Sequence, residues 1–236
     1  MHFASVNPSG KSKLDVDNMN CKNSTVVHFY TGIIFMKLTT HFVSRYFWLA
    51  VILSTGICAP LASTADVVDM AGVKFEDTID QRGSKLVLNG AGVRYKAVFK
   101  VYSAGLYLPK KTNSPEEALS MAGAKRISIT MLRDIDSNEL GKLFTRGVED
   151  NAPKTEMSKL IPGLIRMGQI FSDQKKLVAG DSFTFEWVPG TGGVLTVKGK
   201  VQGESFKEAE FFIALLRIWL GPVPADYKLK EALLGK

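Results

Sequence analysis

The stretch that decides the fold lies at residues 88–108 and reads LNGAGVRYKAVFKVYSAGLYL. Its second part, residues 94–108, is rich in Val, Tyr and Phe with near-alternation, which predicts a β-strand with a possible break near Gly105. Residues 85–89 predict an earlier strand that ends at Gly90 and Gly92. The resulting Gly-Ala-Gly turn leads to Arg94, and we interpret its glycines as permitting close backbone approach.

The rest of the chain alternates between strand and helix patterns. Strands are predicted at 73–79 and 125–132, and a hairpin is predicted at 181–201 around Gly-Thr-Gly-Gly. Helices are predicted at 114–122, 136–150, 155–171 (broken or kinked at Pro162-Gly163), 204–220 and 226–234. With no repeat and no linker, this order predicts one α+β domain.

Residues 36–65 have the layout of a secretory signal peptide. Lys37 and Arg45 give a basic start, an apolar run follows, and small residues end at Ala65. Because the run is shorter than the ~20 residues of a bilayer span, cleavage after Ala65 is favoured over a retained membrane anchor. No stable membrane span is then expected, and the protein is expected to be exported, to the periplasm if the source is a Gram-negative bacterium.

Residues 1–35 are polar and aperiodic, which predicts an untranslated or disordered leader. The domain itself is therefore expected at 66–236. Residues 1–65 hold five of the 30 basic and two of the 23 acidic side chains, so the net charge falls from +7 to +4 on their removal. This mild charge, without a basic cluster, argues against nucleic-acid binding.

Every cysteine and histidine also precedes residue 66. The domain at 66–236 therefore has no thiolate nucleophile, disulfide or histidine general base. A zinc site would need carboxylates alone, so no metal and no cofactor are expected. Any chemistry must come from Arg, Lys, Tyr, Thr, Asn or carboxylates.

Two motifs in order carry a resemblance to a known family. Residues 88–108 resemble the chalcone isomerase segment in which Gly-Ala-Gly-x-Arg precedes a strand ending in Gly-hydrophobic-Tyr-Leu. Residues 211–234, FFIALLRIWLGPVPADYKLKEALL, are similar to the family's C-terminal helix, Leu-Gly turn and closing helix. The domain thus resembles the chalcone isomerase-like family, particularly its secreted bacterial members. The resemblance implies an open-faced β-sandwich: an antiparallel sheet with helices packed on it and a ligand cleft between.

The resemblance also implies a site around Arg94, the position at which the plant enzymes bind a substrate phenolate. Tyr102, on the next strand, replaces a catalytic threonine. Phe144 replaces the tyrosine that accompanies an asparagine, here Asn151, and Ile218 replaces a second threonine. A non-catalytic branch of the family grips a fatty-acid carboxylate with this arginine and a nearby tyrosine, and Arg94 with Tyr102 is similar to that pair.

Three functions follow as expectations. The first is an exported, non-catalytic protein that binds a fatty acid or similar amphipathic carboxylate, with Arg94, Tyr102 and Asn151 as ligand-binding residues. Asn151 also suits a helix C-cap, because Pro153 two residues later fits the end of a helix. The second is an isomerase of the intramolecular lyase type that closes a ring on an enone, with Arg94 and Tyr102 as its catalytic residues. The third is an interaction protein whose vestigial cleft is filled by side chains such as Phe144 and Trp219.

The apolar helix residues could line an acyl cleft or simply form the core. Core is the commoner fate of such faces. Tyr107 is expected on the opposite strand face from Tyr102 because side chains alternate along a strand. The residues in question are Phe144, Leu164, Met167, Phe171, Phe211, Phe212 and Trp219.

Overall fold

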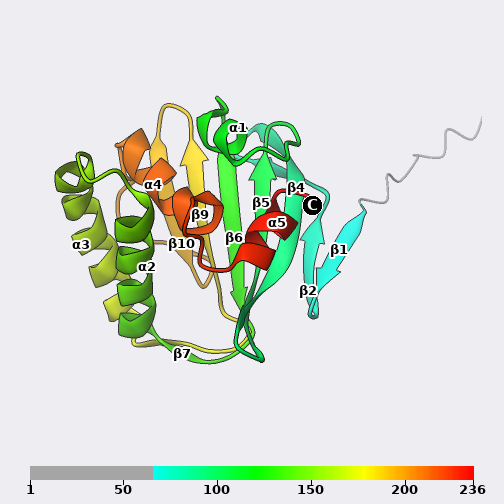
Figure 1. Ribbon diagram of the computed structural model, residues 1–236, viewed down its shortest axis with the longest axis horizontal. Coiled ribbons are helices and arrows are strands. Elements are labelled where there is room, and N and C mark those ends of the chain that lie inside the picture. The colour runs from blue at the N-terminus through cyan, green and yellow to red at the C-terminus, as the bar shows by residue number, and fades with distance from the viewer. Residues whose placement is uncertain (1–65) are drawn as a thin grey trace, which may run out of the picture. The chain divides into compact units, whose positions relative to one another are not determined.

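A seven-stranded antiparallel sheet forms the centre of the structure (Figure 1). Its strand order is β11-β10-β9-β6-β5-β4-β3. The strands are β3 (Thr78–Gln81), β4 (Ser84–Lys96), β5 (Phe99–Leu108), β6 (Lys125–Met131), β9 (Ser182–Val188), β10 (Gly192–Val197) and β11 (Lys200–Val201). Every second residue of β6 is buried, as expected for a strand with one face on a core.

The computed structural model describes residues 66–236, which belong to one compact unit. The predicted leader at 1–35 and signal peptide at 36–65 lie outside the described residues. Within residues 66–236, no helix is long and apolar enough to cross a membrane.

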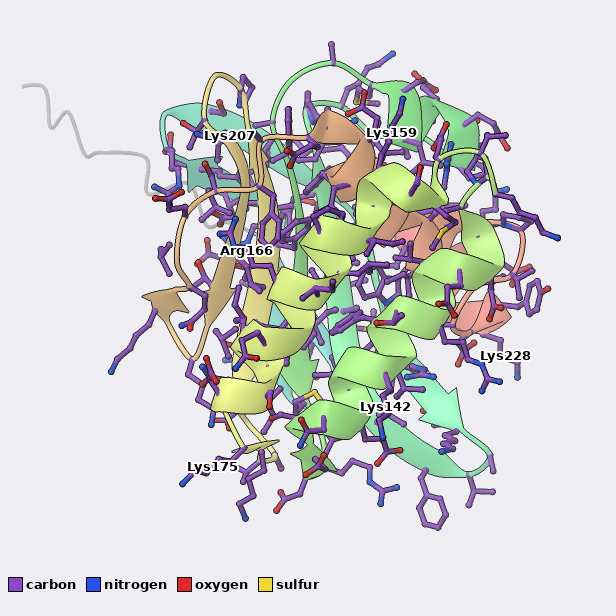
Figure 2. The ribbon with its side chains drawn as sticks, turned by 90° about the vertical axis from the view of Figure 1, so that its left-hand side faces the viewer. Lys142, Lys159, Arg166, Lys175, Lys207 and Lys228 are labelled. Atoms are coloured by element: carbon purple, nitrogen blue, oxygen red, sulfur yellow. The ribbon has the colours of Figure 1, made fainter. Side chains whose placement is uncertain are left out.

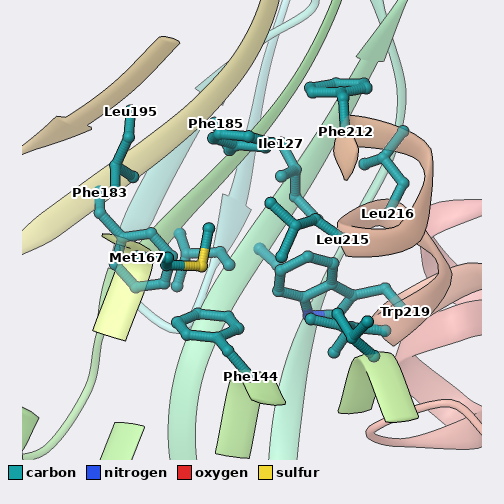
Figure 3. Packing of buried hydrophobic residues seen from close by; sticks show 14 of the residues in the cluster. Ile127, Phe144, Met167, Phe183, Phe185, Leu195, Phe212, Leu215, Leu216 and Trp219 are labelled. Atoms are coloured by element: carbon teal, nitrogen blue, oxygen red, sulfur yellow. The ribbon is translucent and has the colours of Figure 1, made fainter. Parts of the chain in front are cut away.

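Helices cover one face of the sheet, where the larger core lies. They are α1 (Pro115–Ser120), α2 (Ser137–Asn151), α3 (Met157–Asp173), α4 (Ala209–Leu220) and α5 (Tyr227–Leu233). Figure 2 shows α2 and α3 running side by side across the sheet. Their apolar stripes pack with α4 against β5, β6 and β9, and Figure 3 shows aromatic rings from these helices and strands meeting in this core. The α+β fold predicted from the sequence is confirmed.

A second, smaller core lies on the other face of β4 and β5. It is covered by the hairpin of β1 (Val67–Met70) and β2 (Val73–Glu76), and it contains Phe75 and Tyr107. Tyr102 belongs to the larger core, so the predicted separation of Tyr107 from Tyr102 by strand alternation is confirmed. A two-stranded ribbon of β7 (Ile135–Asp136) and β8 (Lys176–Leu177) completes the described elements.

Side-chain caps fix where three helices begin. Ser114 accepts a hydrogen bond from Glu117 N (3.2 Å) ahead of Pro115, as the predicted capping motif requires. Asp136 caps α2 and Asp226 caps α5 in the same way. Of the break or kink predicted at Pro162-Gly163, the break is wrong, because α3 continues through both residues. Gly163, the residue after the proline, lies against the ring of Phe211 on α4, so α3 packs on α4 at this point.

The strand boundaries around Arg94 also differ from those predicted. Gly90 and Gly92 form no turn but lie inside β4, which runs on to Lys96 with a bulge near Gly90. The chain instead reverses at Ala97 and Val98, inside the stretch predicted as one strand, and β5 continues unbroken through Gly105. Ala-Val is not a recognised turn signal, which is why the sequence pattern missed it.

Candidate functional site

Arg94 and Tyr102 face each other across the β4–β5 hairpin. They are directly paired in the strand register, which places both side chains on the helix-covered face. The guanidinium carbon of Arg94 lies 5.5 Å from the centre of the Tyr102 ring. This is within cation–π range, so the two side chains form one unit.

Tyr102 is buried, and its hydroxyl group is held in place by α4. The indole Nε1 of Trp219 donates a hydrogen bond of 2.8 Å to the Tyr102 oxygen. Burial raises the pKa of Tyr102, while the Arg94 charge and the Trp219 hydrogen bond partly offset that rise. The group is therefore a neutral phenol at ordinary pH. Because its oxygen accepts from Trp219, its proton is directed to another acceptor.

Arg94 is half-buried and lacks an internal counter-ion. Its Nε is buried without a hydrogen-bond partner, and no carboxylate of residues 66–236 lies within 4.0 Å of its guanidinium. The charge of Asp226 reaches Tyr102, but that carboxylate accepts hydrogen bonds from the backbone N–H groups of Tyr95, Lys228 and Leu229. An uncompensated guanidinium beside a phenol O–H is an arrangement suited to an anion.

A cavity of about 150 Å³ opens directly onto this pair. Apolar side chains of α2 and α4 form much of its wall, and the turn between α4 and α5 closes it. Arg146 and Asp150 add charged groups. The cavity is lined by Arg94, Tyr102, Leu140, Leu143, Phe144, Arg146, Gly147, Asp150, Ile218, Val223, Pro224 and Ala225.

A second cavity of about 280 Å³ also borders Arg94. The two cavities share Arg94, Leu143 and Ala225 as lining residues. The second is more polar, with Arg133 and Glu139 in its wall. Arg94 therefore borders both a mainly apolar cavity and a more polar one.

The structure brings together most of the positions expected in the site. Arg94, Tyr102, Phe144 and Ile218, which come from two strands and two helices, all line the first cavity. Of these, only Arg94 and Tyr102 are polar. Three positions that carry hydroxyl groups in the plant enzymes thus supply a single hydroxyl here.

Asn151 is not brought to the cavity. Its amide donates to the carbonyl groups of Gly147 (2.9 Å) and Val223 (2.7 Å), and its oxygen accepts from Val223 N–H (2.9 Å). These bonds fasten the end of α2 to the α4–α5 turn. These bonds give Asn151 a structural role at the end of α2, and its contact with a ligand stays a prediction.

Of the apolar side chains expected either to line the cleft or to form the core, one lines the cavity and most others belong to the core. Phe144 lines the cavity and packs edge-on against Trp219, with ring centres 6.0 Å apart (Figure 3). The other apolar candidates belong to the core and do not line this cavity: Leu164, Met167, Phe171, Phe211 and Phe212. The cleft is thus narrowed by side chains, yet Arg94 is not paired with an internal carboxylate.

Sequence reasoning missed two parts of the site. The sequence predicts Trp219 as a group that lines or fills the cleft, whereas in the structure its N–H also fixes the Tyr102 hydroxyl. The wall formed by Val223 and Ala225 was read only as a helix–turn–helix connection. The Trp219–Tyr102 hydrogen bond could have been suspected, because the N–H of a buried Trp needs a partner and the same domain holds a buried Tyr.

Buried phenols predict a loss of stability at alkaline pH. Burial raises the pKa of Tyr107 to about 12, from 10.0, and also raises that of Tyr102. A pKa that is higher in the folded state contributes stability that is present below pH 10 and is lost as the pH rises toward 12. We expect the free energy of unfolding in urea to fall across this window, and to fall less in Tyr107→Phe. Tyr227→Phe removes an exposed phenol and should follow the wild type; an equal decline in both variants would contradict the assignment.

Comparisons with known proteins agree with this architecture. Residues 67–235 match the family model described as chalcone isomerase-like. The chain is similar to the crystal structure of a fatty-acid binding protein of Arabidopsis thaliana, with a TM-score of 0.57 and 16% identity, over 72% of this chain and 96% of that chain. At that identity the likeness shows the fold alone. No curated protein sequence matches the chain.

Proposed function

Because the chain belongs to the chalcone isomerase-like family, we propose that it is a binding protein for an amphipathic carboxylate such as a fatty acid, held by Arg94 and Tyr102. The observation that carries the proposal is the half-buried Arg94 side chain facing an apolar cavity: its buried Nε has no hydrogen-bond partner, and no carboxylate of residues 66–236 lies within 4.0 Å of its guanidinium. A buried charge without a partner costs stability, and a bound carboxylate would remove that cost.

The two polar groups suit a carboxylate. The guanidinium can donate through Nε and a terminal nitrogen, and the Tyr102 O–H can add one further hydrogen bond. Trp219 already occupies the Tyr102 oxygen, so the phenol acts as a donor there. The apolar part of the ligand would lie against Leu140, Phe144 and Ile218.

The volume of the cavity limits the length of the apolar chain that the ligand can have. Sites for small molecules commonly have volumes of about 300–1,000 Å³. The cavity of about 150 Å³ fits a carboxylate with a short apolar chain. A chain as long as that of decanoate would require α2 to move or would pass Leu143 into the second cavity. Ring closure on an enone receives less support, since the cavity offers one phenol and no second hydroxyl group at the expected positions.

The proposal is tested on the chain of residues 66–236, which contains both cores and every described element. Native mass spectrometry of the purified protein should show co-purified acids, and Arg94→Ala should lose them. Arg217→Ala is the matched control, because Arg217 is also half-buried but pairs with Glu156 at 3.7 Å, outside the cavity.

Titration calorimetry of the delipidated protein then separates anion recognition from simple apolar binding. Decanoate should bind the wild type at least about tenfold more tightly than decanol, because charge-assisted hydrogen bonds are worth about 1.5–3 kcal/mol each. Arg94→Ala should erase that preference. Equal retention of acids by Arg94→Ala and the wild type would refute the role of Arg94.

A further inference from the structure

The turn of the β4–β5 hairpin exposes an unusual set of apolar side chains. Tyr95, Val98 and Phe99 are 44%, 82% and 60% exposed, within five consecutive residues. Figure 1 shows this hairpin reaching beyond the neighbouring strands at the lower end of the sheet. Single exposed apolar residues are common on protein surfaces, but three on one protruding turn indicate a site of contact with an apolar surface.

The residue types at the turn also indicate that it contacts another surface. Ala97 occupies the left-handed region with φ of 53°, a conformation that Gly, Asn or Asp adopts at lower cost. The next residue, Val98, is β-branched and almost wholly exposed. A turn that faced only water would gain nothing from either residue, so their presence points to a surface that the turn contacts.

The charged residues of the turn segment itself are all basic. Residues 94–100, RYKAVFK, contain Arg94, Lys96 and Lys100 and no acidic residue. Arg133, from the loop after β6, lies over the ring of Phe99 at 5.4 Å. The adjacent Asp134 is already engaged by Lys176 (3.8 Å) and the N–H of Ala179 (3.0 Å).

A further basic side chain, Lys175, lies at the same end of the molecule, which also carries the acidic Asp134. Figure 2 places Lys175 at the lower end, while Lys159 and Lys207 lie at the upper end. The tip therefore combines exposed apolar side chains with the neighbouring cations Lys96, Lys100 and Arg133. Apolar and aromatic side chains flanked by Lys and Arg are typical of segments that sit in the headgroup region of a bilayer.

We propose that the β4–β5 hairpin tip docks on an anionic phospholipid surface. Val98 and Phe99 enter the boundary between headgroups and acyl chains, and Lys96, Lys100 and Arg133 contact lipid phosphates. A folded protein partner fits less well, because a specific protein interface uses about 20–30 residues on each side and the tip offers only a few. The proposal rests on the tip and stands whether or not Arg94 holds a carboxylate.

The test is co-sedimentation of residues 66–236 with fatty-acid-free vesicles. Vesicles of equimolar phosphatidylcholine and phosphatidylglycerol should bind the protein, vesicles of phosphatidylcholine alone should bind it weakly, and salt should release it. Val98→Asp with Phe99→Asp should weaken the binding at least about tenfold, and so should Lys96→Glu with Lys100→Glu. All four side chains are exposed, so thermal unfolding should show that the variants are folded.

Control variants away from the tip test whether the loss of vesicle binding is specific to the tip. Ile165→Asp changes an apolar residue that is 69% exposed on α3, and Lys159→Glu with Lys207→Glu reverses two charges at the opposite end. These variants should bind vesicles as the wild type does. The proposal is overturned if the wild type ignores the phosphatidylglycerol vesicles, or if the tip and control variants lose binding equally.

Discussion

Replacing Arg94 with methionine is expected to raise the free energy of unfolding of the ligand-free domain by about 1 kcal/mol, and to weaken carboxylate binding about a hundredfold. The stability gain follows because Nε of Arg94 is buried without a partner, and an unsatisfied buried polar group costs about 1–3 kcal/mol. Methionine keeps a chain of similar length in contact with Tyr102. The loss of the cation–π contact, about 0.5–1 kcal/mol, offsets part of the gain.

Urea unfolding of delipidated protein measures the first effect, and calorimetry with decanoate measures the second. Arg217→Met is the control, since it breaks the ion pair with Glu156 and should leave stability unchanged or slightly lower without affecting binding. The decisive result is that Arg94→Met should raise the stability of the ligand-free domain while it lowers the affinity for carboxylate. If Arg94→Met destabilised the ligand-free domain by more than about 1 kcal/mol, Arg94 would be a structural residue and the binding proposal would lose its main support.

The local elements could be predicted from the sequence because local rules govern them. The capping motif at Ser114 and the alternating apolar pattern of β6 act within a few residues, and both appear where predicted. The turn at Ala97 could not be predicted, because no Gly, Asn or Asp marks it. Composition alone predicts one strand through Arg94 and Tyr102, which would place them roughly 26 Å apart at 3.3 Å per residue.

The resemblance supplied what composition could not. It placed Tyr102 on the strand next to Arg94, and the register pairs the two residues directly. It gave Asn151 a ligand contact, whereas the bonds that the structure shows for Asn151 are to Gly147 and to Val223, in a turn 72 residues away. Contacts of that kind depend on how the helices pack, and neither periodicity nor spacing encodes them.

The same limit applies to Gly90. The sequence suggested close backbone approach at this glycine but not what approaches. In the structure it is α5: a side chain at Gly90 would overlap the carbonyl oxygen of Ala232 and come within 2.9 Å of that of Leu233. The neighbouring Asn89 donates a hydrogen bond of 2.7 Å to the Leu233 carbonyl, which fixes α5 against β4.

Gly90→Ala is therefore expected to cost about 3 kcal/mol or more in the free energy of unfolding, because backbone carbonyls cannot rotate away as a side chain can. Urea unfolding measures this loss, and Gly168→Ala is the control. Gly168 lies in α3 with open space around it, so alanine there should stabilise the domain by about 0.5–1 kcal/mol.

The effect of Gly90→Ala should extend to the binding site. To admit the methyl group, α5 must move away from β4, and α5 begins at the Asp226 cap that accepts a hydrogen bond of 3.0 Å from Tyr95 N–H. Ala225, next to that cap, is a wall of both cavities beside Arg94. Decanoate affinity should therefore fall in Gly90→Ala under conditions where the protein remains folded. A variant as stable as the wild type would show that β4 and α5 are not in the close contact on which this geometry depends.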